Sequence, residues 1–159
     1  MTGQTVIEIV EDSLAGSEIA SLLEEHLREM LRITPPGSAH AMNLNALRSP
    51  AITVWSAWRG NALMGCGALK ALNACGGEIK AMHTAHSHRG QGVAKAMLTH
   101  IIAEAEQRHY SHLYIETGAL PAFFPARNLY ARNGFDFCPP FDTYREDPNS
   151  VFMCKVLHG

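Results

Sequence analysis

The most constraining feature of the chain is the glycine-containing turn at residues 88–94, His-Arg-Gly-Gln-Gly-Val-Ala, which follows a predicted strand and opens a long predicted helix. Gly90 and Gly92 lack side chains, so the backbone there can approach a ligand closely. The first N–H groups of the helix have no helical partners, and the helix dipole favours negative charge beside them. Arg89 and Lys95 add positive charge nearby. The segment is therefore either a simple tight turn or a pyrophosphate-binding loop at a strand–helix junction.

The pattern of this turn differs from two common nucleotide-binding loops. Gly92 is followed by Val93, Ala94 and Lys95, so the third glycine of the dinucleotide motif GxGxxG is missing. The Gly-Lys-Ser/Thr ending of a P-loop is missing as well. These differences argue against a protein that binds NAD or ATP through this loop.

The hydrophobic periodicity predicts strands and helices on both sides of the turn. Strands are predicted at residues 6–10, 51–58, 62–72, 78–84, 112–117, 135–138 and 151–157. Helices are predicted at residues 17–32, 40–47, 92–107 and 126–133. Regular alternation along strand 78–84 places Glu78, Lys80, Met82 and Thr84 on one face of the sheet and His83 on the other. Runs of antiparallel strands with helices between them indicate a layered α/β (α+β) fold.

The composition fits one domain spanning residues 1–159 and narrows the classes of function. The chain is 47% hydrophobic and 18% charged with a formal net charge of −2, which is typical of a soluble globular protein. The lack of a basic excess argues against nucleic acid as a partner, and no apolar run approaches the roughly 20 residues that span a membrane. Residues 1–12 contain no positive segment followed by an apolar one, and the four cysteines form no CxxC pair. We therefore expect a cytoplasmic protein with reduced thiols and no signal peptide.

Two motifs together resemble the GNAT superfamily of N-acetyltransferases. Residues 89–94, Arg-Gly-Gln-Gly-Val-Ala, match its (Q/R)xxGx(G/A) coenzyme-A signature, and residues 129–135, Leu-Tyr-Ala-Arg-Asn-Gly-Phe, match its LYxxxGF element. The match runs from Gly76 to Phe135, whereas the first 70 residues match only in the order of elements. Residues 77–80, 89–92 and 116–118 resemble the small bacterial YsnE-type branch of the superfamily.

The resemblance implies a fold and a cosubstrate. The fold would be a mixed, mostly antiparallel central sheet of about seven strands, flanked by about four helices, with a splayed cofactor cleft. The cosubstrate would be acetyl-CoA, with the loop amides on its pyrophosphate and strand 78–84 pairing with its pantetheine arm. The residues so assigned to the cofactor are Met82, His83, Thr84, Arg89, Gly90, Gln91, Gly92, Val93 and Ala94. The backbone N–H of Met82 or a neighbour would stabilise the developing oxyanion, and a homodimer is the assembly common among similar proteins.

Acetyl transfer to an amine needs a base for the amine proton and benefits from an acid for the leaving thiolate. Glu78 is the candidate base, acting directly or through a water; the alternative is a solvated or salt-bridged residue at a strand end. Tyr130 is the candidate acid, because the resemblance places it near the CoA sulfur and an ordinary phenol has a pKa of about 10. The alternative for Tyr130 is a core aromatic residue on an amphipathic helix.

Two further residues are candidates for binding the acceptor. Glu116, at the end of strand 112–117, would orient or deprotonate an amine, or would be a structural hydrogen-bonding residue. Arg28, on helix 17–32, would bind a carboxylate of the acceptor, or would belong to a solvated helix face. Phe123 stands where many relatives have an Asn that contacts the pantetheine, so we expect that arm to be held differently there. The apolar segment 121–125 either walls the acceptor pocket or packs in the core.

The nine histidines do not indicate a metal centre. The spacing of His83, His86 and His88 is not a known zinc spacing, so we expect no metal. His83 is instead an alternative base.

We predict an acetyl-CoA-dependent N-acetyltransferase that acetylates a primary amine of a small molecule or peptide by direct attack in a ternary complex. The alternative is a non-catalytic acyl-CoA-binding sensor on the same fold. The acceptor is not named by any motif, since fold resemblance does not fix a substrate.

Overall fold

The structure, a computed structural model, describes residues 6–38 and 42–157 of the chain. Within these residues the strands are β1 (Glu8–Glu11), β2 (Ile52–Arg59), β3 (Ala62–Asn73), β4 (Gly76–Thr84), β5 (His112–Gly118), β6 (Asp136–Phe137) and β7 (Ser150–Val156). The α-helices are α1 (Ser17–Ile33), α2 (Val93–Gln107) and α3 (Phe124–Arg132). Single 3-10 turns are η1 (Ala46–Arg48), η2 (His86–His88) and η3 (Pro121–Phe123).

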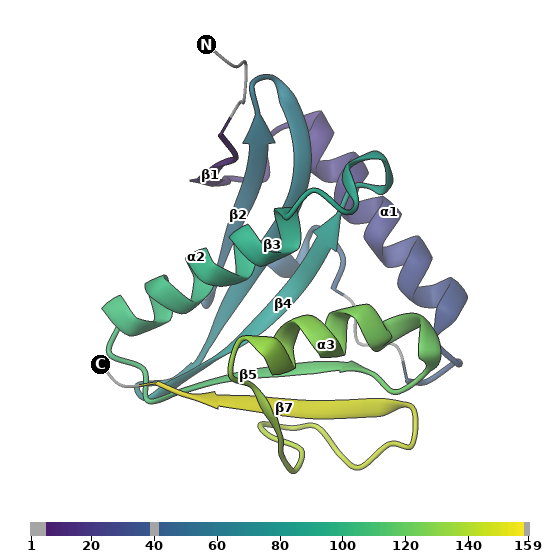
Figure 1. Ribbon diagram of the computed structural model, residues 1–159, viewed down its shortest axis with the longest axis vertical. Coiled ribbons are helices and arrows are strands. Elements are labelled where there is room, and N and C mark those ends of the chain that lie inside the picture. The colour runs from purple at the N-terminus through teal and green to yellow at the C-terminus, as the bar shows by residue number, and fades with distance from the viewer. Residues whose placement is uncertain (1–5, 39–41, 158–159) are drawn as a thin grey trace.

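The strands form one seven-stranded sheet in the order β1-β2-β3-β4-β5-β7-β6 (Figure 1). Neighbouring strands run antiparallel, except that β4 and β5 are parallel and are connected through α2. The predicted mixed, mostly antiparallel sheet of about seven strands is therefore confirmed. Because β4 is the central strand of the sheet, the loop that joins it to α2 begins in the middle of the sheet, at the carboxyl end of β4.

Helices α2 and α3 cover one face of the sheet. Apolar residues recur on α2 every three or four positions, so one side of the helix is apolar and is buried against the strands. The buried residues of α2 are Val93, Met97, Leu98, Ile101 and Ala105. They pack with residues of β3, β4 and β5 and with Tyr130 of α3 in the larger of two hydrophobic clusters.

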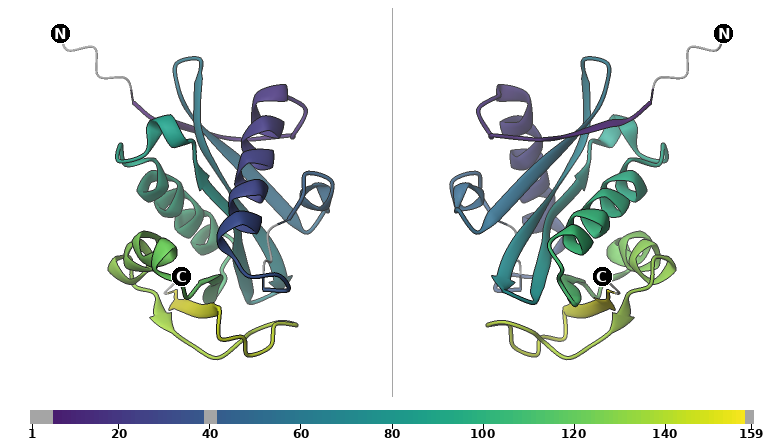
Figure 2. Two further views of the ribbon diagram at one scale, coloured as in Figure 1. Left: turned by 90° about the vertical axis from the view of Figure 1, so that its right-hand side faces the viewer. Right: turned by 90° about the vertical axis from the view of Figure 1, so that its left-hand side faces the viewer.

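Helix α1 covers the opposite face (Figure 2). Its residues Ile19, Leu22 and Leu23 pack with Val54 of β2 and Ala68 of β3 in the smaller cluster. The sheet is thus buried on both faces, and the charged sides of the helices remain in solvent. The layered α/β arrangement predicted from the order of elements is confirmed.

We expect the substitution Ile101→Ala to lower the free energy of unfolding by about 2–5 kcal/mol, the usual cost of removing a large buried side chain. Ile101 has no exposed surface and lies at the centre of the α2 core. The matched control is Thr99→Ala on the exposed side of the same helix, which should change that free energy by less than about 0.5 kcal/mol. Urea denaturation of both variants measures the difference, and equal losses would contradict the packing described for α2.

A β-bulge in β4 changes which side chains face α1. Cys66 of β3 pairs with His83, whereas Ala68 pairs with Lys80, so two residues of β4 oppose the single residue Gly67. Within the bulge Ala81 has a φ of 53°, in the left-handed region. Beyond the bulge the alternation is therefore reversed.

The sequence-based assignment of strand faces is wrong beyond Lys80 for this reason. Glu78 and Lys80 do share one face, but Met82 packs with the α2 core, on the other face. His83, expected opposite Glu78, points instead toward α1 on the same side. Because of the bulge, the side chain of His83 faces α1 and the side chain of Met82 faces α2.

Strands β4 and β5 separate beyond their first residues. Their parallel pairing begins at Gly76 and His112 and, in the residues described, ends at Ile79 and Ile115. Figure 1 shows the two strands starting side by side and diverging toward their carboxyl ends. The predicted splayed cleft is confirmed, and it exposes one backbone edge of β4.

The helix content is lower than the sequence predicted. Three α-helices occur in the described residues rather than about four, because the helix predicted at 40–47 reduces there to the single turn η1. Residues 40 and 41 of that prediction lie outside the described residues. In the ranges described, no helix is long and apolar enough to cross a lipid bilayer.

Candidate active site

The loop between β4 and α2 has the geometry of an anion-binding turn. Gly90 and Gly92 have φ values of 77° and 83°, a backbone conformation that glycine adopts at little cost. A Cβ on either glycine would meet no atom within 4 Å, so both positions open onto free space. Gly92 is the N-cap of α2, and no side chain caps this helix. The first N–H groups of α2 are therefore available to a ligand.

A groove of about 510 Å3 runs from this loop along α2 and between α1 and α3; we call it the loop groove. Its walls include most of the residues predicted to bind the cofactor, namely Met82, His83, Thr84, Arg89, Gly90, Gly92, Val93 and Ala94. Lys95 also lines the groove and supplies a cation there. Gln91 does not line it, because its side chain hydrogen-bonds with Arg59 and with the Ser87 carbonyl.

Arg89 is held at the mouth of the loop groove by α1. Its guanidinium donates to both carboxylate oxygens of Glu29, each at 3.0 Å. Burial alone would raise the pKa of Glu29, but the hydrogen bonds and charge of Arg89 outweigh it and lower that pKa. Glu29 therefore stays ionised and fixes the orientation of Arg89.

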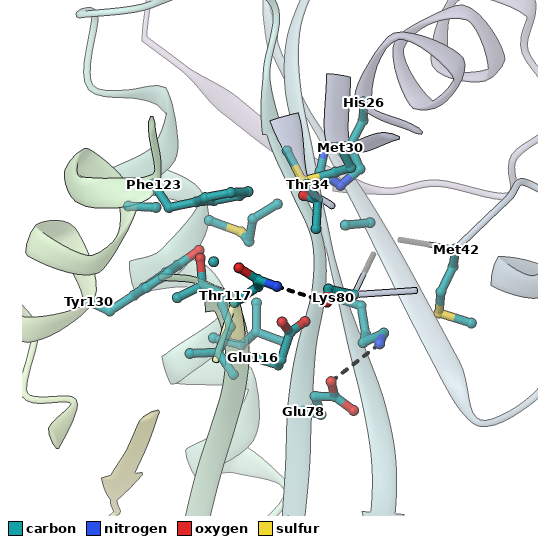
Figure 3. A pocket seen from close by; sticks show the side chains of 18 residues that line it. His26, Met30, Thr34, Met42, Glu78, Lys80, Glu116, Thr117, Phe123 and Tyr130 are labelled. Atoms are coloured by element: carbon teal, nitrogen blue, oxygen red, sulfur yellow. Dashed lines mark hydrogen bonds and ion pairs between the residues drawn. The ribbon is translucent and has the colours of Figure 1, made fainter. Parts of the chain in front are cut away.

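A second cavity of about 160 Å3 lies where β4 and β5 separate; we call it the inner cavity (Figure 3). Its walls include Glu78 and Lys80 of β4, Glu116 and Thr117 of β5, and residues of α1. The inner cavity and the loop groove share six lining residues: His26, Met30, Met82, Phe123, Ala126 and Tyr130. The two spaces therefore join, and these six side chains surround the junction.

Tyr130 of α3 is buried at this junction, with 4% of its surface exposed. Burial raises its pKa, so the hydroxyl keeps its proton across the neutral range. In Figure 3 the hydroxyl points into the cavity, toward the side that Thr117 and Glu116 line. A protonated phenol at the meeting point of two binding spaces can donate a proton or a hydrogen bond to a group held there.

Glu78 lies in a compact polar cluster on the inner cavity. Only 1% of the surface of Glu78 is exposed. Its Oε2 accepts a hydrogen bond of 2.6 Å from the Tyr144 hydroxyl and forms an ion pair of 3.3 Å with the Lys80 ammonium. The Lys80 ammonium also donates to the Tyr144 hydroxyl at 2.8 Å. Burial and the Glu78 carboxylate raise the pKa of Tyr144, so Tyr144 stays a neutral donor. Both contacts of Glu78 use the same oxygen.

Two buried histidines, His26 of α1 and His83 of β4, contact each other beside the junction. The Nδ1 atoms of His26 and His83 lie 3.1 Å apart, and Nε2 of His83 lies 2.7 Å from a carboxylate oxygen of Glu25. Glu29 lies 3.8 Å from His83 Nδ1. Burial, then the charge of His83, lower the pKa of His26 to about 4, so His26 is neutral at physiological pH. No group of three His, Cys, Asp or Glu side chains able to hold a metal ion occurs in the described chain.

The predicted acceptor residues lie in different places. Glu116 lines the inner cavity, facing it from β5 (Figure 3). Arg28 lines neither space: its side chain is 72% exposed and pairs with Glu24 at 3.8 Å. Phe123 lines both spaces and lies against Gly118, where a Cβ would overlap its ring.

Three residues of this site, His26, Lys80 and Tyr144, were not assigned from the sequence. His26 follows Ile19, Leu22 and Leu23 at helical spacing, so its place on the buried side of α1 had a signal. Tyr144 comes from the loop between β6 and β7, and no sequence pattern joins it to Glu78. Lys80 was noted only as a neighbour of Glu78 on its strand.

The sequence of the chain matches one family across most of this structure. The model of the acetyltransferase (GNAT) family matches residues 16–135, which include both cavities' principal walls. The chain belongs to the GNAT acetyltransferase family. The GNAT match covers α1 through α3, so the elements that build the loop groove are those of the family.

Known GNAT proteins agree with this assignment. The chain is 55% identical over 146 residues to the uncharacterized N-acetyltransferase YsnE of Bacillus subtilis, covering 92% of this chain and 97% of that protein. An acyl-CoA N-acyltransferase structure from Klebsiella pneumoniae has a TM-score of 0.77 at 26% identity, covering 96% of this chain and 99% of that one. A GNAT acetyltransferase structure from Elizabethkingia anophelis with acetyl-CoA bound has a TM-score of 0.67 at 21% identity, covering 95% and 98%. The expected kinship with the small YsnE-type branch is thus confirmed, and this chain is a GNAT N-acetyltransferase.

Proposed function

We propose that this GNAT enzyme transfers the acetyl group of acetyl-CoA to a primary amine of a small molecule or peptide by direct attack in a ternary complex. The observation that carries the proposal is the junction at Tyr130. One space suited to a phosphate-bearing thioester and another lined by carboxylates meet there. Two substrates bound in these spaces would bring their reacting ends together, which raises their effective concentration.

The loop groove fits acetyl-CoA on three grounds. The open positions at Gly90 and Gly92 and the uncapped start of α2 suit a pyrophosphate. Arg89 and Lys95 add positive charge on the same side. The unpaired edge of β4 beyond Ile79 offers backbone groups to the amides of the pantetheine arm, and an N–H at Met82 or its neighbour could receive the oxyanion.

By the GNAT resemblance, Phe123 stands where many relatives have an Asn that contacts the pantetheine arm. Its ring is buried at the junction, packed against Gly118, and faces the groove from η3. An apolar ring cannot hydrogen-bond the arm but can pack along its methylene groups. We therefore propose that the arm is held here by packing.

The inner cavity fits a small primary amine or the end of a peptide. Its volume is about 160 Å3, and Glu78 and Glu116 place carboxylates on its walls, where they would attract an ammonium group. Tyr130 is the proposed acid for the leaving thiolate. Glu78 is a candidate base, acting through the carboxylate oxygen Oε1 or through a water, because Oε2 already accepts from Tyr144 and Lys80.

Incubation of the protein with acetyl-CoA and a panel of primary amines tests the proposal. We expect at least one amine to gain an acetyl group, measured by mass spectrometry, with release of one free CoA thiol per product. The panel should include amino acids, polyamines and short peptides, because each presents a primary amine of a different charge. Tight acetyl-CoA binding without transfer to any of them would instead favour an acyl-CoA sensor.

A further inference from the structure

The hydrogen-bond geometry of the two buried histidines fixes where their protons lie. Glu25 is a carboxylate and only accepts hydrogen bonds, so Nε2 of His83, 2.7 Å away, carries a proton. When His83 is neutral, its Nδ1 therefore has a lone pair. The Nδ1 of His26, 3.1 Å from it, must then carry the proton that joins the two rings.

This arrangement leaves the lone pair of neutral His26 on Nε2. His26 lines both the loop groove and the inner cavity, and it reaches the inner cavity from α1 (Figure 3). Its Nδ1 already faces His83, so Nε2 is the ring nitrogen that remains for a group in the cavity. The carboxylate and the two rings thus form a chain that ends in a proton acceptor beside the reaction site.

We propose that His26 is the catalytic base of this enzyme. His83 orients His26 and accepts its Nδ1 proton, and Glu25 is a positioning residue that orients His83. The proposal rests on the acetyltransferase function proposed above. It assigns a chemical role to α1, which lies outside both of the GNAT motifs at residues 89–94 and 129–135.

The proton and the electrons balance along this chain. The amine N–H bond breaks as the His26 Nε2–H bond forms, and the His26 Nδ1–H proton passes to His83 Nδ1. The nitrogen of the neutral amine forms its bond to the acetyl carbon, the carbon–sulfur bond breaks, and the sulfur takes a proton from Tyr130. The Tyr130 phenolate then regains a proton from solvent, which balances the proton that His83 gives up. The positive charge ends on His83, between the carboxylates of Glu25 and Glu29.

The surroundings of His26 favour passing the proton onward. Burial and His83 lower the pKa of His26, so His26 itself does not hold the proton. The charged and titratable groups that contact the pair or line the same two spaces are Glu25 and Glu29 of α1, Cys66 of β3, Glu78 and Lys80 of β4, Arg89 of the loop, Lys95 of α2, Glu116 of β5 and Tyr130 of α3. Glu25 is 43% exposed, so the proton can leave from there to solvent.

Glu78 is less suited to this task. Its Oε2 accepts from the Tyr144 hydroxyl at 2.6 Å and from the Lys80 ammonium at 3.3 Å. Taking up a proton would weaken an ion pair that is almost fully buried, which is costly. The neutral rings of His26 and His83 carry no such partner ammonium.

Nitrogen-15 NMR of the histidine rings tests the geometry without any substrate. At alkaline pH we expect His26 to be the Nδ1–H tautomer and His83 the Nε2–H tautomer. Neutral His26 protonated on Nε2 at alkaline pH would overturn the relay.

Kinetics of the variant His26→Gln test the chemical role. We expect kcat to fall by about 100-fold, the usual effect of losing a general base, with an unchanged Kd for acetyl-CoA. The decline of kcat/KM toward acidic pH that we expect in the wild-type protein should disappear in His26→Gln, because the variant has no base to protonate. His83→Gln should reduce kcat similarly. Glu25→Gln should also reduce kcat, because the carboxylate that orients His83 is lost.

The matched control is Glu24→Gln, an exposed carboxylate on the same helix, which should leave kcat within about twofold. Because His26 is buried, thermal stabilisation of each variant by acetyl-CoA shows that it is folded. Full activity of folded His26→Gln, or loss of the acidic decline in Glu78→Gln instead, would overturn the assignment of His26 alone. Absence of transfer by the wild-type protein would defeat the proposed function, and this assignment with it.

Discussion

Replacing Gly92 with glutamate will abolish the stabilisation of this protein by acetyl-CoA. A side chain at Gly92 would enter the open space before α2, and its carboxylate would repel the pyrophosphate proposed to bind there. A ligand that binds only the folded state raises the free energy of unfolding by RT ln(1 + [L]/Kd), about 2.7 kcal/mol at one hundred times Kd. We expect this full increase in the wild-type protein and none in Gly92→Glu, measured by thermal unfolding with and without acetyl-CoA.

The matched control for this experiment is Gly60→Glu. Gly60 also has a positive φ, 59°, and open space at its Cβ, so the substitution brings the same charge and a similar backbone cost. It lies in the turn between β2 and β3 and lines neither cavity. We expect Gly60→Glu to keep the stabilisation by acetyl-CoA. Equal stabilisation of Gly92→Glu would show that the cosubstrate binds elsewhere.

Replacing Tyr130 with phenylalanine will lower kcat by about 100-fold, because the proposed acid for the leaving thiolate is lost. The ring remains, so the packing of α3 against Phe135 and the binding of acetyl-CoA should persist. Burial raises the pKa of Tyr130, and the hydroxyl is therefore protonated throughout the working pH range. Steady-state kinetics, together with the Kd for acetyl-CoA, separate the loss of chemistry from a loss of binding.

Tyr114→Phe is the control for Tyr130→Phe. Tyr114 is a tyrosine on β5 whose ring stacks on Phe141, and it lines neither cavity. The same atom is removed at both positions, so a general effect of losing a phenol oxygen would appear in both variants. We expect only Tyr130→Phe to lose activity, and an undiminished kcat in that variant would remove Tyr130 from the reaction.

The residues around the loop show how far local sequence carries the prediction. The glycine pattern at 90–92 and the apolar period of residues 93–105 lie within one stretch of chain, and each depends on neighbours a few positions away. Both were therefore readable from the sequence, and the structure places eight of the nine predicted cofactor residues on one groove. The strands were predicted within a few residues for the same reason, since side-chain alternation is a local property.

The face on which β4 presents His83 shows where that prediction stops. Alternation along residues 78–84 is regular in the sequence, and nothing in it marks the extra residue of the bulge. The bulge arises from pairing with β3, a strand whose own register is set by packing on both faces. One added residue moves every side chain beyond it to the opposite face of the sheet. Met82 and His83 therefore each lie on the face that was predicted for the other.

The sequence by itself determined the order of the strands, the glycine loop that we propose binds the cosubstrate, and the family of the protein. The tertiary structure alone decided which polar side chains meet around the two joined cavities. Tyr144 reaches Glu78 across 66 residues of chain, and His26 reaches His83 across 57. Such contacts depend on how α1 and the loop before β7 pack against the splayed strands. Local periodicity records which side of an element is buried, but not what it is buried against.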